Sequence, residues 1–174
     1  SDIYSIEVLK KENGIEINVE ISSEKFTRLK ELRRNLTGRT GCGLCGAESL
    51  DHVLKIPNLK KNSSTFLSTS ILNALKNFST EQVIQKKTGA THASGLFDSD
   101  GNLIKLKEDV GRHNALDKLI GAASNLNVLD NYFVITSSRA SYEMVQKIAY
   151  MNLKLLVDIS APTALATRLA KELE

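Results

Sequence analysis

The two cysteines of this chain, Cys42 and Cys45, are separated by two residues inside a short stretch, residues 39–46, that also holds three glycines. Glycine adopts positive φ angles at little steric cost, so this stretch is predicted to form an exposed, pliable loop of the kind that often carries function. A cysteine reacts as its thiolate, and the neighbouring Arg39 can favour that form electrostatically. The pattern therefore predicts that these sulfur atoms do chemistry.

Four interpretations of the cysteine pair compete. A zinc site needs about four ligands, and beyond the two thiols the chain offers only His52, His92 and His113. A thioredoxin-like pair sits between a strand and a helix, whereas this pair follows a predicted helix, so disulfide exchange is the secondary interpretation. Burial as two small apolar side chains conflicts with glycine on nearly every side. The fourth is a nucleophilic or persulfide-carrying thiol on a mobile Cys-x-x-Cys loop.

A second group of candidate residues lies at the start of a predicted helix. Arg112, His113 and Asn114 are consecutive there, and His92 precedes them in a predicted strand. At a helix N-terminus a cation, an imidazole and an amide can converge on an anionic ligand. The sequence leaves open the alternative of a solvated helix N-terminus capped by Asp109.

Two small polar stretches, residues 136–139 and 160–163, each follow a predicted strand and lead directly into a predicted helix. Free backbone N–H groups and the helix dipole favour phosphate at such positions. Arg139 ends the first stretch, and it has two interpretations, a phosphate clamp or a salt-bridge partner.

The elements that position these residues follow from periodicity and turn signals. Alternating apolar residues around Asn13-Gly14 predict an N-terminal β-hairpin, and Ser22 or Ser23 begins an amphipathic helix that ends near Leu36. Later strands and helices alternate, which implies an α/β fold with βαβ units and ligand sites at the carboxyl ends of strands. The later elements are a strand at 53–56, a helix at 66–78, a helix begun by a capping box at 79–82 and ended at Thr88-Gly89, strands at 91–97 and 103–107, a helix at 112–124, a strand at 132–135, a helix at 140–152, a strand at 155–159 and a helix opened by Pro162 at its first position.

The composition is that of a soluble globular domain, with 41% hydrophobic and 25% charged residues. A net charge of +3 is far from the clustered basic footprint of a nucleic-acid binder, so no nucleic-acid partner is expected. No apolar run is long enough to cross a bilayer, and the first residues lack the features of a signal peptide. The chain is therefore expected to be cytoplasmic, without a membrane partner.

Five stretches taken together closely resemble the FdhD family, the sulfur carrier proteins needed for formate dehydrogenase activity. They occur in the family's order and span the chain from the hairpin to the last helix. The stretches are residues 39–46, 91–93, 108–118, 137–141 and 160–164. Position 90 is Ala where the family pattern has a second Gly.

The resemblance implies a sulfurtransferase. It would receive persulfide sulfur from a cysteine desulfurase and pass it to the molybdenum cofactor, as bis(molybdopterin guanine dinucleotide), for the formate dehydrogenase apoenzyme. Cys42 would carry the persulfide, and Cys45 would assist or resolve it. The guanine and phosphate groups of the cofactor, or of a guanine nucleotide, would be bound by residues near the strand ends: His92, Arg112, His113, Ser138 and Arg139.

The resemblance also implies a cytidine-deaminase-like fold, a three-layer α/β/α arrangement with a mixed sheet, and a homodimer. Deaminase activity is not implied. Deaminases need zinc bound in the order H-x-E and then P-C-x-x-C, whereas here the cysteines come first and Ser94 stands where that Glu would be. No stably bound metal of the protein's own is expected.

The predicted organisation is one sulfurtransferase core domain over residues 1–174. It consists of a hairpin and helix (1–36), the cysteine loop (37–50) and an α/β core (51–174). Family members also carry a segment before Ser1 and, after the last helix, a strand and a basic glycine-containing tail. The chain is therefore expected to be a core fragment whose cofactor affinity is weakened.

Two functions of other classes remain alternatives. One is a non-enzymatic chaperone that binds the molybdenum cofactor and hands it to formate dehydrogenase, with the cysteines serving contact. The other is a redox or metal-binding module that uses Cys42 and Cys45 as ligands.

Overall fold

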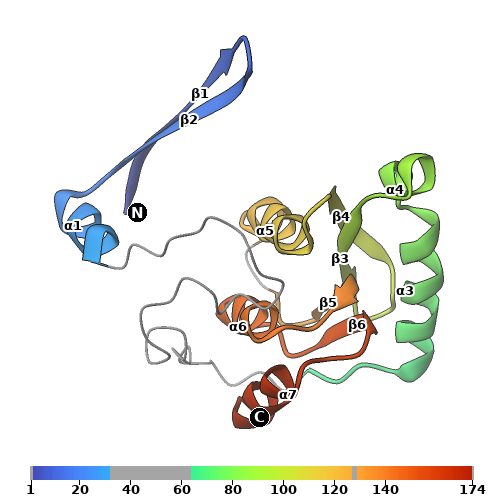
Figure 1. Ribbon diagram of the computed structural model, residues 1–174. Helices are drawn as coiled ribbons and strands as arrows, with labels where there is room; N and C mark the ends of the chain where they lie inside the picture. Colours follow the sequence, from blue (N-terminus) through green and yellow to red (C-terminus); the bar gives the residue numbers. More distant parts are fainter. Residues whose placement is uncertain (1, 32–63, 127–128, 174) are drawn as a thin grey trace. The chain divides into compact units, whose positions relative to one another are not determined.

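The structure, a computed structural model, describes residues 2–31, 64–126 and 129–173 (Figure 1). These residues belong to two compact units, the first containing residues 2–31 and the second containing the remainder. The predictions made for Cys42, Cys45, the end of the helix near Leu36 and the strand at 53–56 fall outside the described residues.

The first unit begins with the predicted hairpin. Strands β1 (Ile3–Lys11) and β2 (Gly14–Ile21) pair antiparallel, and α1 (Ser23–Glu31) follows. The hairpin is confirmed, because the alternating apolar residues share one face of the ribbon: Ile6 pairs with Val19, and Val8 pairs with Ile17. The Ser22 hydroxyl accepts a hydrogen bond from the Lys25 backbone N–H at 3.4 Å, which favours the start of α1 at this point.

The second unit is an α/β domain. Its four-stranded sheet has the order β4-β3-β5-β6, in which β3 is antiparallel to both neighbours and β5 is parallel to β6. The α/β class and the mixed sheet are thereby confirmed, while the kinship to cytidine deaminases stays a prediction. The elements are α3 (Ser68–Thr80), α4 (Val83–Thr88), β3 (His92–Asp98), β4 (Leu103–Asp109), α5 (Arg112–Ala123), β5 (Tyr132–Arg139), α6 (Tyr142–Tyr150), β6 (Leu156–Ser160) and α7 (Ala164–Glu172).

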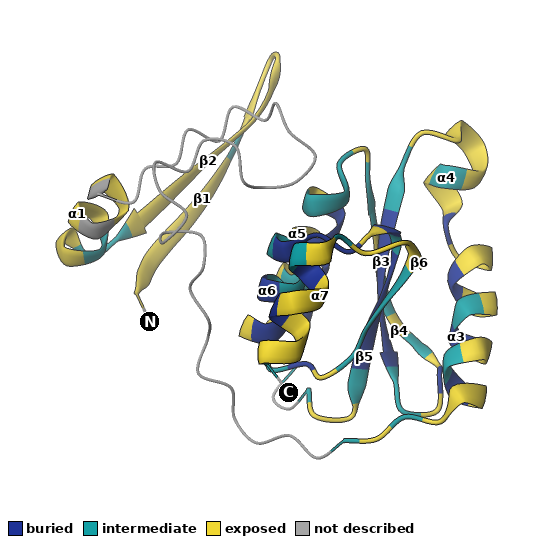
Figure 2. Cartoon of the chain, turned by 60° about the horizontal axis from the view of Figure 1, so that its bottom comes forward, coloured by how far each residue is buried: buried dark blue, intermediate teal, exposed yellow. Residues whose placement is uncertain are grey.

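Helices cover both faces of this sheet (Figure 2). Consecutive strand residues point to opposite faces, so Phe97 packs with Phe78 of α3, while Leu96 packs with Leu116 of α5 and Met144 of α6. Helix α7 lies on the side of α5 and α6 (Figure 2). No helix among the described residues is long and apolar enough to cross a membrane.

The predicted capping box at residues 79–82 is wrong. The Ser79 and Thr80 hydroxyls instead donate back to carbonyl oxygens of α3, at 2.8 and 2.9 Å. The N-terminus of α4 is capped from a distance, because the Glu108 carboxylate of β4 accepts from the backbone N–H groups of Ile84 at 2.9 Å and Gln85 at 2.7 Å. A tertiary acceptor therefore replaces the local one.

The predicted place of Pro162 is also wrong. Thr163 is the N-cap of α7, and its hydroxyl accepts from the Ala166 N–H at 3.2 Å. Pro162 therefore precedes the cap instead of occupying the first helical position. The Thr163 side chain decides the start, because it can pair an N–H group of the first turn and proline cannot.

Candidate functional site

The polar residues of the second unit gather at one edge of its sheet. Because β3 runs against β4 and β5, and β5 runs with β6, the carboxyl ends of β4, β5 and β6 lie at the same edge as the amino end of β3. We call this the polar edge. All five sequence-predicted binding residues lie at it, at strand ends or at the start of α5: His92, Arg112, His113, Ser138 and Arg139.

A bulge in β5 shapes the polar edge. Between Thr136 and Arg139 the register against β6 shifts, and such irregularities re-aim side chains. The Ser137 hydroxyl accepts a 2.9 Å hydrogen bond from the Ala93 backbone N–H and lies 3.2 Å from His92 Nδ1. Ser137, which was not among the predicted binding residues, therefore fixes the His92 ring at the start of β3.

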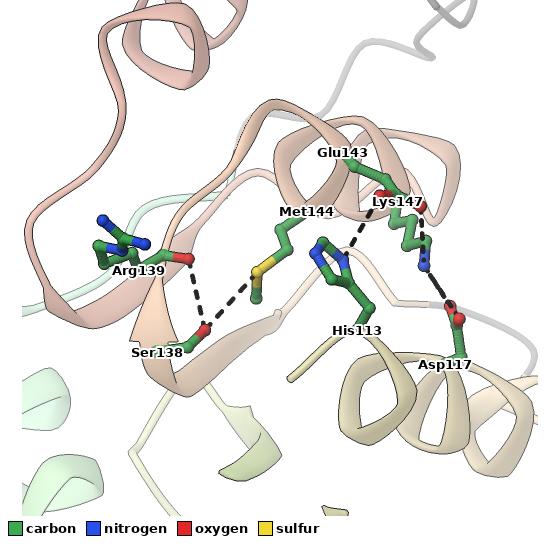
Figure 3. Close-up of polar contacts among 7 residues, drawn as sticks. All are labelled: His113, Asp117, Ser138, Arg139, Glu143, Met144 and Lys147. Atoms are coloured by element: carbon green, nitrogen blue, oxygen red, sulfur yellow. Dashed lines mark hydrogen bonds and ion pairs between the residues drawn. The ribbon is translucent and has the colours of Figure 1, made fainter. Parts of the chain in front are cut away.

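Ser138 and Arg139 take different environments although they are adjacent. The buried Ser138 hydroxyl lies 3.6 Å from the Met144 sulfur and 3.3 Å from the Arg139 carbonyl oxygen (Figure 3). The exposed Arg139 guanidinium points away from His113 (Figure 3). Ser138 thus supports the edge from within, and Arg139 is accessible to a ligand in solution.

His113 connects α5 to α6 through charged groups. Its Nδ1 lies 3.6 Å from Glu143 Oε2, and Lys147 is paired with both Glu143 at 3.5 Å and Asp117 at 2.9 Å (Figure 3). Burial lowers the pKa of His113, and the Glu143 carboxylate only partly opposes that effect. The lowered pKa favours the neutral form of the imidazole, which lies between the N-termini of the two helices.

Several buried polar atoms at the polar edge have no hydrogen-bond partner among the described residues: Arg112 Nε, both ring nitrogens of His113, and the hydroxyls of Ser94 and Ser141. Ser141 is the N-cap residue of α6, yet its side chain makes no capping bond and the residue is only 3% exposed. A buried polar group without a partner costs about 1–3 kcal/mol. Arg112 Nε and His113 Nε2, at the N-terminus of α5, fit an anionic ligand, phosphate groups included.

The Asn114 amide does not join these groups, contrary to the predicted convergence. Asn114 donates to Asp109 at 3.2 Å, and Asp109 also accepts from the Gly111 N–H at 2.8 Å. Hydrogen bonding from Lys118, 2.5 Å away, lowers the pKa of Asp109. Asp109 therefore organises the turn into α5, but it is not the predicted cap, because the N-cap residue is Gly111 and no described side chain makes a capping bond there.

Asp158 of β6 is a further residue of this region that the sequence analysis missed. Its carboxylate accepts a 2.5 Å hydrogen bond from Thr136, its register partner in β5. Burial raises the pKa of Asp158 to about 6, although the Thr136 bond acts in the opposite direction. The only sequence signal is an acidic residue inside an otherwise apolar strand.

Cys42 and Cys45 lie outside the described residues. Among the residues that the structure does describe, no three His, Cys, Asp or Glu side chains are grouped so that they could hold a metal ion. The donors at the polar edge can recognise an anion, and the candidate nucleophiles remain those of the sequence.

Comparison with known proteins places these features in a family. The chain is 49% identical over 173 residues to a protein of Cupriavidus necator named sulfur carrier protein FdhD, and the match covers 99% of this chain and 60% of that protein. A protein of the same name from Bordetella parapertussis is 43% identical over 99% of this chain and 63% of its own length. The chain thus spans about three fifths of the curated relatives it matches.

A solved structure supports the fold. It is described as that of a candidate formate dehydrogenase accessory protein from Desulfotalea psychrophila, and it superposes with a TM-score of 0.67 at 23% identity. The match covers 99% of this chain and 62% of the other. The model of the FdhD/NarQ family matches residues 1–174, and the chain therefore belongs to that family.

Proposed function

We propose that this chain carries sulfur for the maturation of formate dehydrogenase. Relatives up to 49% identical are named sulfur carrier proteins, and the family model covers the whole chain. The expected donor is a cysteine desulfurase, the expected acceptor is the molybdenum cofactor, and the recipient is the formate dehydrogenase apoenzyme. A homodimer stays part of the proposal.

The transfer would use the thiol chemistry of Cys42. Its thiolate attacks the outer sulfur of the desulfurase persulfide, a bond from Cys42 to that sulfur forms, and the desulfurase cysteine leaves as a thiolate. No net oxidant is needed, because the sulfane sulfur is exchanged between two thiols. Cys45 would assist or resolve the persulfide, and glycine-rich sequence around both residues suits a carrier that must reach two partners.

One observation carries the cofactor part of the proposal: Arg112 Nε and His113 Nε2, at the N-terminus of α5, are buried without a hydrogen-bond partner among the described residues. The guanine dinucleotide half of the cofactor bears phosphate groups that such donors recognise. His92, Ser138 and Arg139 would complete the binding set from β3 and β5.

GDP, used in place of the guanine dinucleotide, tests this part. We expect calorimetric titration to detect GDP binding and Arg112→Ala to weaken it about tenfold, as for a lost charge-assisted contact. Arg168→Ala is the matched control, because Arg168 is an exposed arginine of α7 that is not among the predicted binding residues. Equal affinity of both variants and the unchanged chain would contradict the assignment.

The alternative is a chaperone that binds the cofactor without carrying sulfur. One feature favours this alternative: the hydrogen-bond donors of the polar edge belong to residues other than the cysteines, so cofactor binding there would not need a thiol. Cys42→Ala in cells that depend on this chain for formate dehydrogenase separates the two functions. Retained dehydrogenase activity would support the chaperone, and lost activity with GDP binding intact would support the carrier.

A further inference from the structure

The second unit has a cavity beside β4. It has a volume of about 670 Å³ and is lined by none of the five predicted binding residues. Val83 and Ile84 of α4 form one wall, Lys118 and Ala122 of α5 form the other, and Leu106 and Lys107 of β4 lie between them. We call this cavity the β4 groove.

The β4 groove runs along an edge strand. In the part of the chain that the structure describes, β4 ends the sheet and pairs only with β3. Backbone N–H and C=O groups on its outer side are therefore available to another strand. Val83 and Ile84 beside it are 55% and 47% exposed, so an apolar surface accompanies the free backbone groups.

The polar groups of the groove are paired internally, with one exception. Glu108 caps α4 and also accepts from the Thr91 hydroxyl at 3.3 Å. The Lys118 amine binds Asp109 and the Glu108 carbonyl oxygen. Within the described residues no hydrogen bond or ion pair engages the Lys107 side chain, whose charge is offered to an occupant of the groove.

Charge identifies the occupant. If β4 paired with β4 of a second copy around Leu106, Lys105 of each copy would face Lys107 of the other, and like charges opposite one another destabilise a sheet. Carboxylates would instead complement both lysines. We propose that the β4 groove docks an extended, acidic segment of a partner protein, which adds a strand to β4 and inserts an apolar side chain between α4 and α5.

This inference is independent of the cysteines and of the cofactor, so it stands or fails apart from the proposed function. The probe is a fluorescein-labelled decapeptide of alternating valine and glutamate, titrated by fluorescence polarisation. We expect saturable binding of this peptide, and Lys107→Glu should weaken it about tenfold. A peptide of alternating valine and lysine should bind the Lys107→Glu variant and so restore the interaction. Lys76→Glu on α3 is the matched control for the charge change and should bind normally.

A second variant tests the groove itself. Ala122→Trp places a large side chain in the cavity from the α5 wall, and it should abolish binding while urea unfolding verifies that the variant is folded. Hydrogen exchange of the unchanged chain should slow at backbone amides of β4 when the peptide is bound, because strand addition pairs them.

Three outcomes would overturn the proposal. The first is that no peptide binds at 1 mM. The second is that neither Lys107→Glu nor Ala122→Trp weakens binding. The third is that a single-stranded oligonucleotide displaces the peptide and also binds the Ala122→Trp variant normally. The last result would assign the lysines to a general polyanion surface.

Discussion

Asp158 carries the most perturbed carboxyl group described in the chain. It faces the helix layer of α5 and α6, beside Thr136, where burial raises its pKa to about 6. In the unfolded chain the group would titrate near 3.8, so the folded state binds the proton more tightly. Its contribution to stability is therefore complete below pH 4 and is lost as the pH rises through about 6.

Asp158→Asn should stabilise the protein at neutral pH. The amide oxygen can still accept from Thr136, and the charge that burial disfavours is gone. After a discount for partial exposure, we expect a gain in the free energy of unfolding of about 1–2 kcal/mol at pH 7.5, shrinking toward pH 4. Urea unfolding at both pH values measures it, with Asp100→Asn in an exposed turn as the control. A loss of stability at neutral pH would mean that the carboxylate has partners worth more than its burial costs.

Glu143 should set the proton affinity of His113. Its carboxylate raises the pKa of His113 against the larger effect of burial, so Glu143→Gln should lower that pKa further. The chain has three histidines, and NMR titration of their ring protons is readily assigned with His52→Gln and His92→Gln. Glu81→Gln, an exposed change at the end of α3, is the matched control. An unchanged or raised pKa would show that Glu143 does not face the ring.

Among the elements, the strands and helices whose signals are local could be predicted from sequence. The hairpin of β1 and β2 follows from alternation around Asn13-Gly14, and the start of α5 follows from Gly111. The start of α4 could not be predicted, because its cap, Glu108, lies 23 and 24 residues away from the groups it binds. Whether the first N–H groups of α4 bind a nearby acceptor or a distant one depends on how β4 packs against α4. The local sequence pattern carries no information about that packing.

Glu108→Ala should therefore loosen α4. The backbone N–H groups of Ile84 and Gln85 would lose their acceptor, which for a helix cap costs about 1–2 kcal/mol. Urea unfolding should show this loss, and hydrogen exchange should become faster at those two amides. Glu81→Ala, one turn earlier and exposed, should leave both unchanged. Unchanged exchange in Glu108→Ala would contradict the capping assignment.

The sequence indicated candidate residues for the site, but it did not indicate which residues contact one another. Strand ends and helix starts marked His92, Arg112, His113 and Arg139 as candidates, and the family resemblance added Ser138 to the expected binding set. The contacts depend on register: Ser137 meets His92 across 45 residues, and Thr136 meets Asp158 across 22. Alternating strands and helices predicted the parallel βαβ unit, but the bulge in β5 and the register of its pairing with β3 and β6 have no sequence signal here.

At the scale of the whole molecule, the second unit separates two surfaces. The polar edge, with Arg112 Nε and His113 Nε2, suits an anionic ligand, and the β4 groove suits a polypeptide segment. A carrier that binds cargo and also meets partner proteins needs both kinds of surface. In the proposed function the sulfur would be carried by Cys42, which lies outside the described residues.

The most direct test of that assignment is intact-protein mass spectrometry after incubation with an active cysteine desulfurase and free cysteine. We expect a gain of about 32 Da that a reductant reverses, that persists in Cys45→Ala and that is absent in Cys42→Ala. The absence of any gain in the unchanged chain, while the same desulfurase loads another acceptor, would contradict a sulfur carrier and leave the cofactor chaperone.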